Sequence, residues 1–168
     1  MERLIRRVLP PLPGSVALAG VVIAGIGWSL SAGWARWDEV QGSGLGISQV
    51  LPPLLAGGMA TVLALWFAIG AVLWAMCRVC GQHAGFRTVL MVLSGAGIAM
   101  TLVTPAAAFH LAGGAPLSLW FLFALGAAVS CLQVVASLTE AAAMPQAKAW
   151  ASLILTGVFC ASFVSLYQ

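Results

Sequence analysis

The sequence predicts an all-α membrane protein, a polytopic helix bundle with five transmembrane helices. Hydrophobic residues make up 62% of the 168-residue chain and charged residues only 7%, whereas about 25% of residues are charged in a typical soluble domain. The few charges stand in short clusters that long apolar runs separate. A water-exposed surface could not be built from this composition, so we expect the apolar runs to face lipid.

The apolar runs set the domain organisation. A helix of about 20 apolar residues crosses a hydrocarbon core of roughly 30 Å, and five runs come close to this length or exceed it. We expect a short basic cytoplasmic tail over 1–14 and a single transmembrane domain over 15–168. The expected spans are 15–33, 50–76, 88–112, 116–138 and 149–167.

Two features predict how these helices bend and pack. Pro105 lies inside the third span, where a proline removes a backbone hydrogen bond and collides with the preceding turn, so we expect a bend between Thr101 and Ala106. Pairs of small residues four apart allow close approach of helices in lipid, either within the monomer or in a homo-oligomer. These pairs are Gly20 and Ala24, Ala56 and Ala60, Gly95 and Ala99, and Gly126 and Ser130.

The distribution of Lys and Arg predicts the orientation. Cytoplasmic segments of membrane proteins carry an excess of these residues. With the N-terminus in the cytoplasm, six basic residues fall on the inner side and one, Arg36, on the outer side. The six inner residues are Arg3, Arg6, Arg7, Arg78, Arg87 and Lys148. An odd number of spans then places the C-terminus outside, with Tyr167 in the outer interface.

The N-terminal run has a second interpretation. A basic head followed by apolar residues and the sequence Gly33-Trp34-Ala35 is also typical of a cleavable signal peptide. The apolar part is longer than the usual 7 to 15 residues of such a signal. We therefore favour a retained first span.

The segment Cys77-Arg-Val-Cys80, followed by His83, allows three interpretations. Two thiolates three residues apart on a helix could bind one metal ion, but zinc requires four ligands and no second cysteine pair lies on the inner side. A thioredoxin-like redox motif would need a strand and a helix around it. We favour a hinge without a metal site, with Gly81 as a left-handed cap that ends the second span. Thr88 would be the N-cap of the third span.

Intramembrane polar residues are few. Gln133 in the fourth span and His110 near the outer end of the third are the candidates for polar contacts within the membrane, because such groups are costly in lipid and mark functional sites. No nucleophile, base and orienting group converge in the sequence, so neither an enzyme nor a cofactor is expected. The net charge of +3 is too small and too scattered to indicate nucleic-acid binding.

The run AMCRVCGQHAGFRTVLMV, residues 75–92, resembles the signature of the Yip family of five-span membrane proteins. Gly81, Gly85 and Phe86 carry the match, and SLTEAAAMPQAKAWASLIL resembles the family's inner loop before its last span. The resemblance covers roughly residues 50–168. It implies a non-enzymatic membrane scaffold or adaptor, and eukaryotic members bind Rab-type GTPases in vesicle traffic. The Ala- and Gly-rich composition favours a bacterial member in the inner membrane.

Two function classes follow. A scaffold would meet lipid headgroups or a GTPase-like membrane partner through its inner surface, whose candidate residues are Arg78, His83, Phe86, Arg87 and Lys148. The alternative is a small transporter or lipid-handling protein with a site between the third and fourth spans, near Pro105 and Gln133. A polar cavity that reaches Gln133 would favour the alternative, and a tightly packed bundle would favour the scaffold.

Overall fold

The computed structural model describes residues 14–114 and 116–165, and in this part of the chain all regular structure is helical. The predicted all-α class is therefore confirmed. The helices are α2 (Gly14–Ala35), α3 (Trp37–Gly42), α4 (Ile47–Val79), α5 (Phe86–Gly95), α6 (Gly97–Met100), α7 (Thr104–Leu111), α8 (Leu117–Ala141) and α9 (Gln146–Ser165). The basic tail, with Arg3, Arg6 and Arg7, and the interface residue Tyr167 lie outside the described residues.

Each apolar run of the sequence corresponds to one helical segment, with α5–α7 together forming the third. Among the described residues, α4 and α8 are long and apolar enough to cross a membrane, and α5 with the bent segment 97–111 makes a third candidate. The chain is thus a helical membrane protein. Five spans and the direction of the termini stay predictions.

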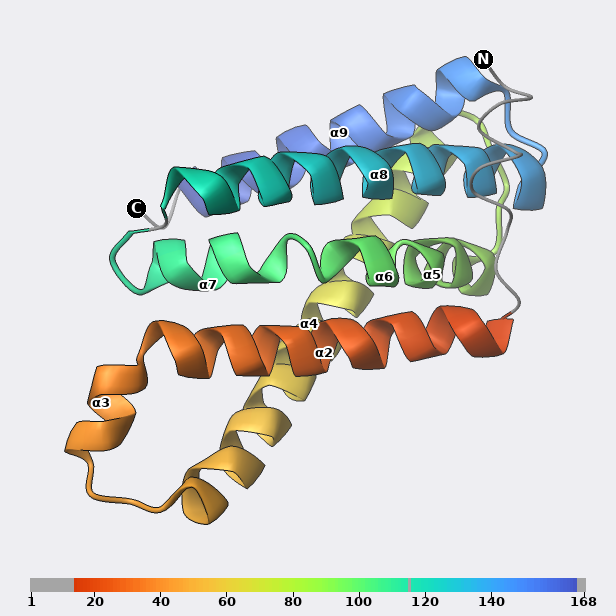
Figure 1. The fold of residues 1–168 in the computed structure, drawn as a ribbon. Helices are drawn as coiled ribbons and strands as arrows, with labels where there is room; N and C mark the ends of the chain where they lie inside the picture. The colour runs from red at the N-terminus through yellow and green to blue at the C-terminus, as the bar shows by residue number, and fades with distance from the viewer. Residues whose placement is uncertain (1–13, 115, 166–168) are drawn as a thin grey trace.

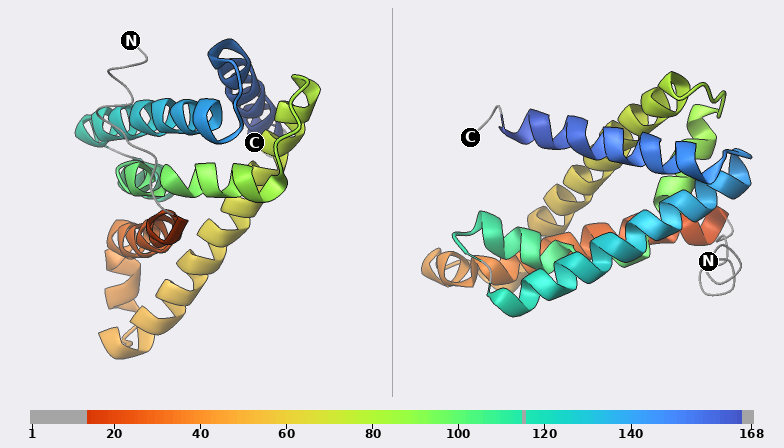
Figure 2. Two further views of the ribbon diagram at one scale, coloured as in Figure 1. Left: turned by 90° about the vertical axis from the view of Figure 1, so that its right-hand side faces the viewer. Right: turned by 90° about the horizontal axis from the view of Figure 1, so that it is seen from above.

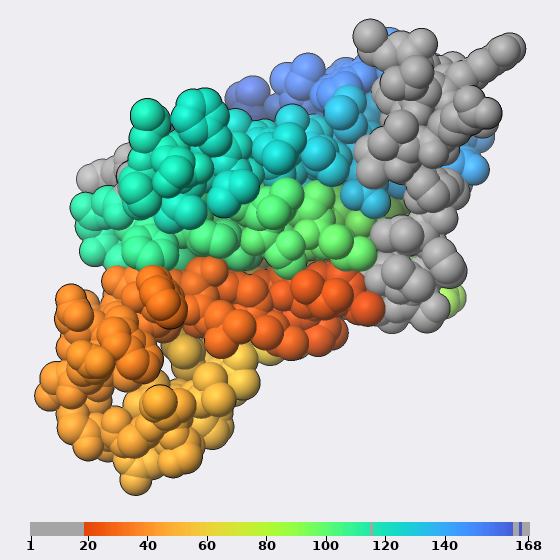
Figure 3. Space-filling model, in the orientation of Figure 1, coloured from red at the N-terminus to blue at the C-terminus, as the bar shows by residue number. Residues whose placement is uncertain are grey.

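Successive segments run back and forth through the molecule (Figure 1). The start of α2, the turn 80–85 and the loop 142–145 lie at one end, on the right of Figure 1, whereas α3 and the α7–α8 connection lie at the other. α2, α5–α7 and α8 are stacked side by side, and Figure 3 shows this stack as one continuous face with α3 projecting below it. α4 crosses behind the stack at a steep angle and contacts α2, α5 and α9 (Figure 2).

The apolar core lies toward the end that holds the turn 80–85. It joins the last turns of α4 and α8 to α5 and to the start of α9. Its fully buried members include Leu73, Val89 and Leu138. Away from this core, large apolar side chains are widely exposed, and Phe121 on α8 keeps 71% of its surface accessible. Such exposure is unfavourable in water but suits side chains that face lipid.

The turn after α4 confirms the predicted role of Gly81. This glycine has φ of +74°, a left-handed conformation that L side chains rarely adopt. Its N–H donates to the carbonyl of Arg78, and the N–H of Gln82 donates to the carbonyl of Cys77, each at 3.0 Å. This pair of hydrogen bonds is a Schellman motif, which satisfies the last carbonyls of the helix.

The predicted N-cap of the third segment is wrong. α5 begins at Phe86, and its N-cap is Gly85 in an extended conformation. Thr88 therefore lies within the first turn. A glycine can cap the start of a helix without a side-chain oxygen when the first N–H groups of the helix can donate hydrogen bonds to water. The side chain of Thr88 is thus left for another contact.

The third segment is broken in two places. Residues 101–103 form a turn between α6 and α7, as expected from Pro105, which occupies the first turn of α7. The hydroxyl of Thr104 donates to the carbonyl of Thr101 at 3.0 Å, and this is the carbonyl to which the missing N–H at position 105 would have donated. This hydroxyl therefore satisfies the carbonyl of Thr101, which the proline leaves without its N–H donor.

The larger bend was not predicted. α5 and the segment 97–111 meet at 50°, so the bend lies at Ala96. Here α2 crosses at backbone contact, because a Cβ added to Gly97 would lie 2.7 Å from the carbonyl carbon of Gly20. On the opposite side α8 approaches equally closely, since a Cβ on Gly126 would lie 2.8 Å from Cβ of Leu102. The bent region is thus held between two helices.

The predicted small-residue pairs explain this packing. Three of the four pairs are buried between helices, namely those on α2, α5–α6 and α8. Ala56 and Ala60 on α4 are exposed instead. Gly20 and Gly126 thus mark close helix contacts within the monomer, whereas a Cβ on Gly95 would meet no atom of another helix within 4 Å.

Candidate functional site: a polar cavity between α5 and α8

The two predicted intramembrane polar residues lie in different surroundings. Gln133 faces inward from α8 and is only 9% exposed. His110 is exposed near the end of α7, and its ring meets the Trp120 ring edge to face at a centroid distance of 5.5 Å. The structure does not bring these two side chains into one site. Gln133 alone belongs to a cavity.

A cavity of about 210 Å³ opens between α5 and α8. Its lining combines polar side chains with small and apolar ones. The lining residues are Thr88, Met91, Val92 and Gly95 from α5, and Gln133, Ser137, Glu140 and Ala141 from α8. This is the place between the third and fourth segments where a ligand site was the alternative expectation, although Pro105 does not take part.

The polar lining of α8 forms one stripe. Gln133, Ser137 and Glu140 follow one another at intervals of four and three residues, which places them on one face of an α-helix. Glu140 lies near the end of α8, beside the loop 142–145, and Gln133 lies roughly two turns deeper. Thr88 is the polar residue of α5 that faces this stripe.

The polar side chains of this stripe differ in hydrogen bonding from several other polar side chains of the helices. Several hydroxyl groups elsewhere donate to the carbonyl of the preceding turn, as Ser29 does to Gly25 at 2.9 Å and Ser94 to Leu90 at 2.7 Å. Among the described residues, the side chains of Thr88, Gln133 and Ser137 make no hydrogen bond that meets ordinary geometric limits. In the described part of the chain, the fully enclosed polar side-chain atoms without a partner belong to Trp66, Ser130 and Ser152, so the amide of Gln133 keeps some accessible surface. The amide of Gln133 is therefore available to a molecule within the cavity.

Gly95 keeps the cavity open. This glycine is buried on α5, yet a Cβ added to it would meet no heavy atom within 4 Å. Its hydrogen faces the cavity instead of a neighbouring helix. A large side chain at position 95 would consequently fill the cavity without pushing helices apart.

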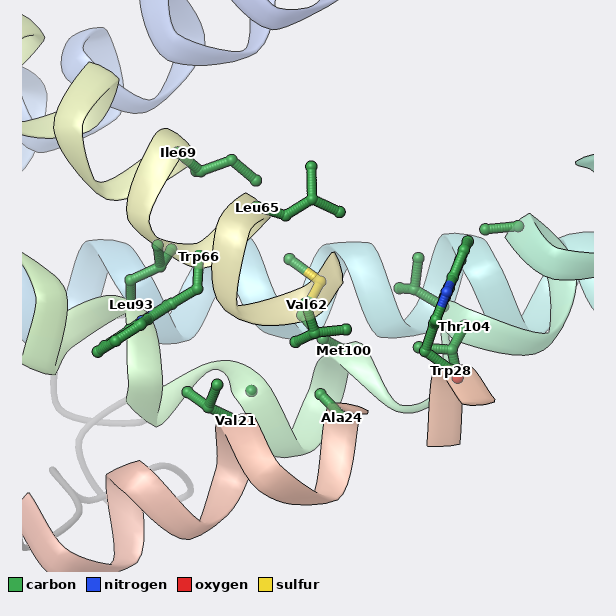
Figure 4. Close-up of a pocket in the computed structure, with 13 residues that line it drawn as sticks. Val21, Ala24, Trp28, Val62, Leu65, Trp66, Ile69, Leu93, Met100 and Thr104 are labelled. Carbon is green, nitrogen blue, oxygen red and sulfur yellow. The ribbon is translucent and has the colours of Figure 1, made fainter. Parts of the chain in front are cut away.

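A second cavity of about 260 Å³ lies between α2, α4 and α5–α7 (Figure 4). Its lining is almost wholly apolar and includes Trp28, Trp66 and Met100. The hydroxyl of Thr104 borders it but donates to the carbonyl of Thr101. The indole N–H of Trp66 in this lining is buried without a hydrogen-bond partner in the described part of the chain, whereas the rest of the lining is apolar and in a membrane suits hydrocarbon.

The predicted inner-surface residues gather around the turn 80–85. The indole N–H of Trp74 donates to the carbonyl of Ala84 at 3.1 Å. The Trp74 ring also meets the Phe86 ring edge to face at 6.0 Å, and the guanidinium carbon of Arg78 lies 5.0 Å from its centroid. Trp74 therefore holds the turn in place from both sides.

The remaining predicted contact residues are exposed around this turn. His83, Arg87 and Lys148 all face outward. The ammonium of Lys148 would lie 3.8 Å from a Cβ placed on Gly81, so the turn and the start of α9 are neighbours. None of the five predicted contact residues lines the polar cavity. They form a separate inner surface.

The cysteines do not assemble a metal site in the part of the chain that the structure describes. Cys77 is buried in the core beside Ser152, Cys80 is half-buried, and both are free thiols. Within 14–114 and 116–165, no three His, Cys, Asp or Glu side chains lie close enough together to hold a metal ion.

The comparisons with known proteins return no relative. No family model, curated protein or solved structure matches the chain. Membership of the Yip family thus stays a prediction from the segment 75–92. The fold and the site together define a helical membrane protein with a polar cavity between two of its helices.

Sequence reasoning identified Gln133 but missed the other members of the site. Ser137 and Glu140 could have been found from their spacing, because polar residues at such intervals inside an apolar helix share a face. Thr88 and Gly95 carried no local signal for a cavity. Their roles depend on the register between α5 and α8, which only the structure provides.

Proposed function

We propose that this protein is a small transporter or lipid-handling protein that binds a polar or amphiphilic molecule between α5 and α8. The observation that carries this proposal is Gln133, a buried residue that lines a cavity and whose amide makes no hydrogen bond to the described residues. Polar groups at membrane depth are expensive and mark ligand or ion pathways. A bundle built only as a scaffold would be expected to fill this space with apolar side chains.

The breaks in the third segment support the proposal. Irregular backbone at membrane depth is tolerated where it is buried in protein or lines a cavity. The bend at Ala96 lies between the polar cavity, which Gly95 borders, and the apolar cavity, which Gly97 borders. α5 and the segment 97–111 meet there at 50°. A change in that angle would alter both cavities together.

Filling the polar cavity should abolish ligand binding. We expect a Gly95→Leu variant to bind the small molecule or lipid at least about tenfold more weakly than wild type, because the leucine side chain would occupy the space of the ligand. A tenfold loss of affinity corresponds to about 1.4 kcal/mol of binding free energy. Native mass spectrometry of the detergent-extracted protein measures this loss. Gly157→Leu is the matched control, since Gly157 is an exposed helical glycine with equally open surroundings. Equal adducts on all three proteins would refute the ligand site.

A scaffold is the second candidate, and the inner surface favours it. Trp74 holds the turn 80–85 rigidly enough to present His83, and Arg78 and Arg87 flank that residue. The basic residues suit anionic lipid, at about 1 kcal/mol for each charge near the surface. A protein partner would also contact the uncharged part of the turn. Such a partner could be GTPase-like or another membrane protein.

The two uses of the inner surface can be separated by substitution. If the turn docks a partner, His83→Ala should reduce recovery of the crosslinked partner and leave binding to anionic vesicles nearly unchanged. Phe86 is kept in this variant because its ring packs on Trp74. The comparison is a variant with Arg78 and Arg87 both changed to Gln. Crosslinks that survive His83→Ala and disappear only in this charge variant would indicate lipid anchoring alone.

We also assign the protein to a bacterial inner membrane, with the turn 80–85 and the loop 142–145 in the cytoplasm. Arg78, Arg87 and Lys148 lie at this end, and Arg36 belongs to the opposite end, between α2 and α3. This distribution agrees with the excess of Lys and Arg expected on the cytoplasmic side.

A further inference from the structure

The charge of the polar cavity restricts the kind of ligand that it can take. Among the described residues that line it, Glu140 is the only charged one, and the others are hydroxyl, amide, apolar or glycine. Arg78, Arg87 and Lys148 are exposed near the same end of the molecule but do not line the cavity. A carboxylate at the mouth attracts a cation and opposes a phosphate or carboxylate group.

The hydrogen-bonding groups restrict the ligand further. A primary ammonium has three N–H donors, and the cavity offers the carboxylate of Glu140 and the hydroxyl of Ser137 as acceptors on adjacent turns of α8. Gln133 lies about 10 Å from Glu140 along the helix axis and is placed to meet a second polar group of the ligand. A quaternary ammonium has no N–H donor and is normally held against aromatic rings. None of the described residues that line this cavity is aromatic. A divalent metal ion would require more oxygen ligands than one carboxylate and its neighbours provide.

From these features we propose that the α5–α8 cavity binds the primary ammonium of a small alkylamine or of an aminolipid headgroup. Glu140 supplies the counter-charge near the mouth, and Ser137 and Gln133 accept or donate hydrogen bonds deeper in the cavity. This inference rests on the proposed function, in which the cavity is a ligand site. The chemistry is shared by a free amine and a lipid headgroup.

Two titrations test the ammonium specificity with the full-length protein in detergent. Ethanolamine should bind wild type with a dissociation constant of about 1 mM or lower, and choline, which carries the same hydroxyethyl group on a quaternary nitrogen, should bind at least about tenfold more weakly. Glu140→Gln keeps the shape of the side chain and removes its charge. It should weaken ethanolamine binding by about tenfold or more, because the ammonium loses a hydrogen bond to a charged acceptor.

Nanodiscs separate the two sources of the ammonium group. Wild type is reconstituted with phosphatidylethanolamine or with phosphatidylcholine and then extracted for native mass spectrometry. Selective retention of phosphatidylethanolamine, lost in Glu140→Gln, indicates a lipid headgroup. Ethanolamine binding without selective lipid retention indicates a free amine. Thermal melting of each variant confirms that it is folded, and Glu140 is an exposed residue whose substitution should not change the fold.

The outcomes distinguish this inference from the proposed function. If Gly95→Leu loses its bound molecule while Glu140→Gln keeps it, the cavity is a ligand site but the ammonium assignment is wrong. If wild type binds neither ethanolamine nor phosphatidylethanolamine, or binds choline equally well, the ammonium assignment is also wrong. If Gly95→Leu binds like wild type and like Gly157→Leu, the proposed function itself fails.

Discussion

Replacing Gly97 with leucine should lower the stability of the folded protein more than any other single change considered for this chain. A Cβ at this position would lie 2.7 Å from the carbonyl carbon of Gly20 and 2.9 Å from its oxygen. These are backbone atoms, which cannot rotate aside as a flexible side chain can. α2 and α6 would therefore have to separate where they now touch.

The expected loss exceeds that of ordinary overpacking. Extra methylene groups in a packed interior cost about 1–3 kcal/mol, and a leucine at Gly97 adds several of them at a backbone contact. The separation would also disturb α8, whose Gly126 packs against the other side of the bent region, where an added Cβ would lie 3.0 Å from the carbonyl oxygen of Ala99. Melting of the purified protein in a mild detergent measures the change.

Gly95→Ala is the matched control for this prediction. Gly95 and Gly97 stand on either side of the same bend, yet a Cβ on Gly95 meets nothing within 4 Å. Alanine in a helix is more favourable than glycine by roughly 0.5–1 kcal/mol, so this control should melt at the wild-type temperature or slightly above it. Equal melting temperatures for Gly97→Leu and wild type would show that α2 and α6 do not make the close contact.

The sequence predicted those features that short stretches of the chain determine. The apolar runs locate every long helical segment, because length and hydropathy decide whether a helix suits a membrane. Gly81 was recognised as a helix cap, because the left-handed conformation and the end of the apolar pattern coincide there. Pro105 likewise predicted the interruption before α7, since proline acts on its own turn.

Features that depend on contacts between distant residues were not predicted. The bend at Ala96 involves Gly20 on another helix, and nothing in the adjacent sequence requires a bend of 50°. Thr88 was assigned to a cap because its position near a helix start suggested one. In the structure Gly85 takes that role, and Thr88 faces Gln133 and Ser137 across the cavity. The site therefore arises from the register of α5 against α8.

The orientation of the chain in the membrane predicts a large difference in reporter activity, because a topology reporter is either active or silent. A reporter that works only in the cytoplasm should be silent when fused after Gln168, and active when inserted at His83 or in the loop 142–145. The physical reason is the six-to-one excess of Lys and Arg on the expected inner side. Activity of the fusion after Gln168 would mean an even number of spans.

If the number of membrane spans is even, a reporter at one further position tests whether the bent pair is the segment that does not cross the membrane. The bent pair α5 and 97–111 can be a single broken span or a re-entrant loop that returns to the side it entered. A broken span places Gly113 opposite His83, so a reporter inserted at Gly113 should be silent while one at His83 is active. Activity at both positions would make the pair re-entrant. The α8 helix would then start on the cytoplasmic side and cross the membrane, so Glu140 at its end would lie on the side opposite His83.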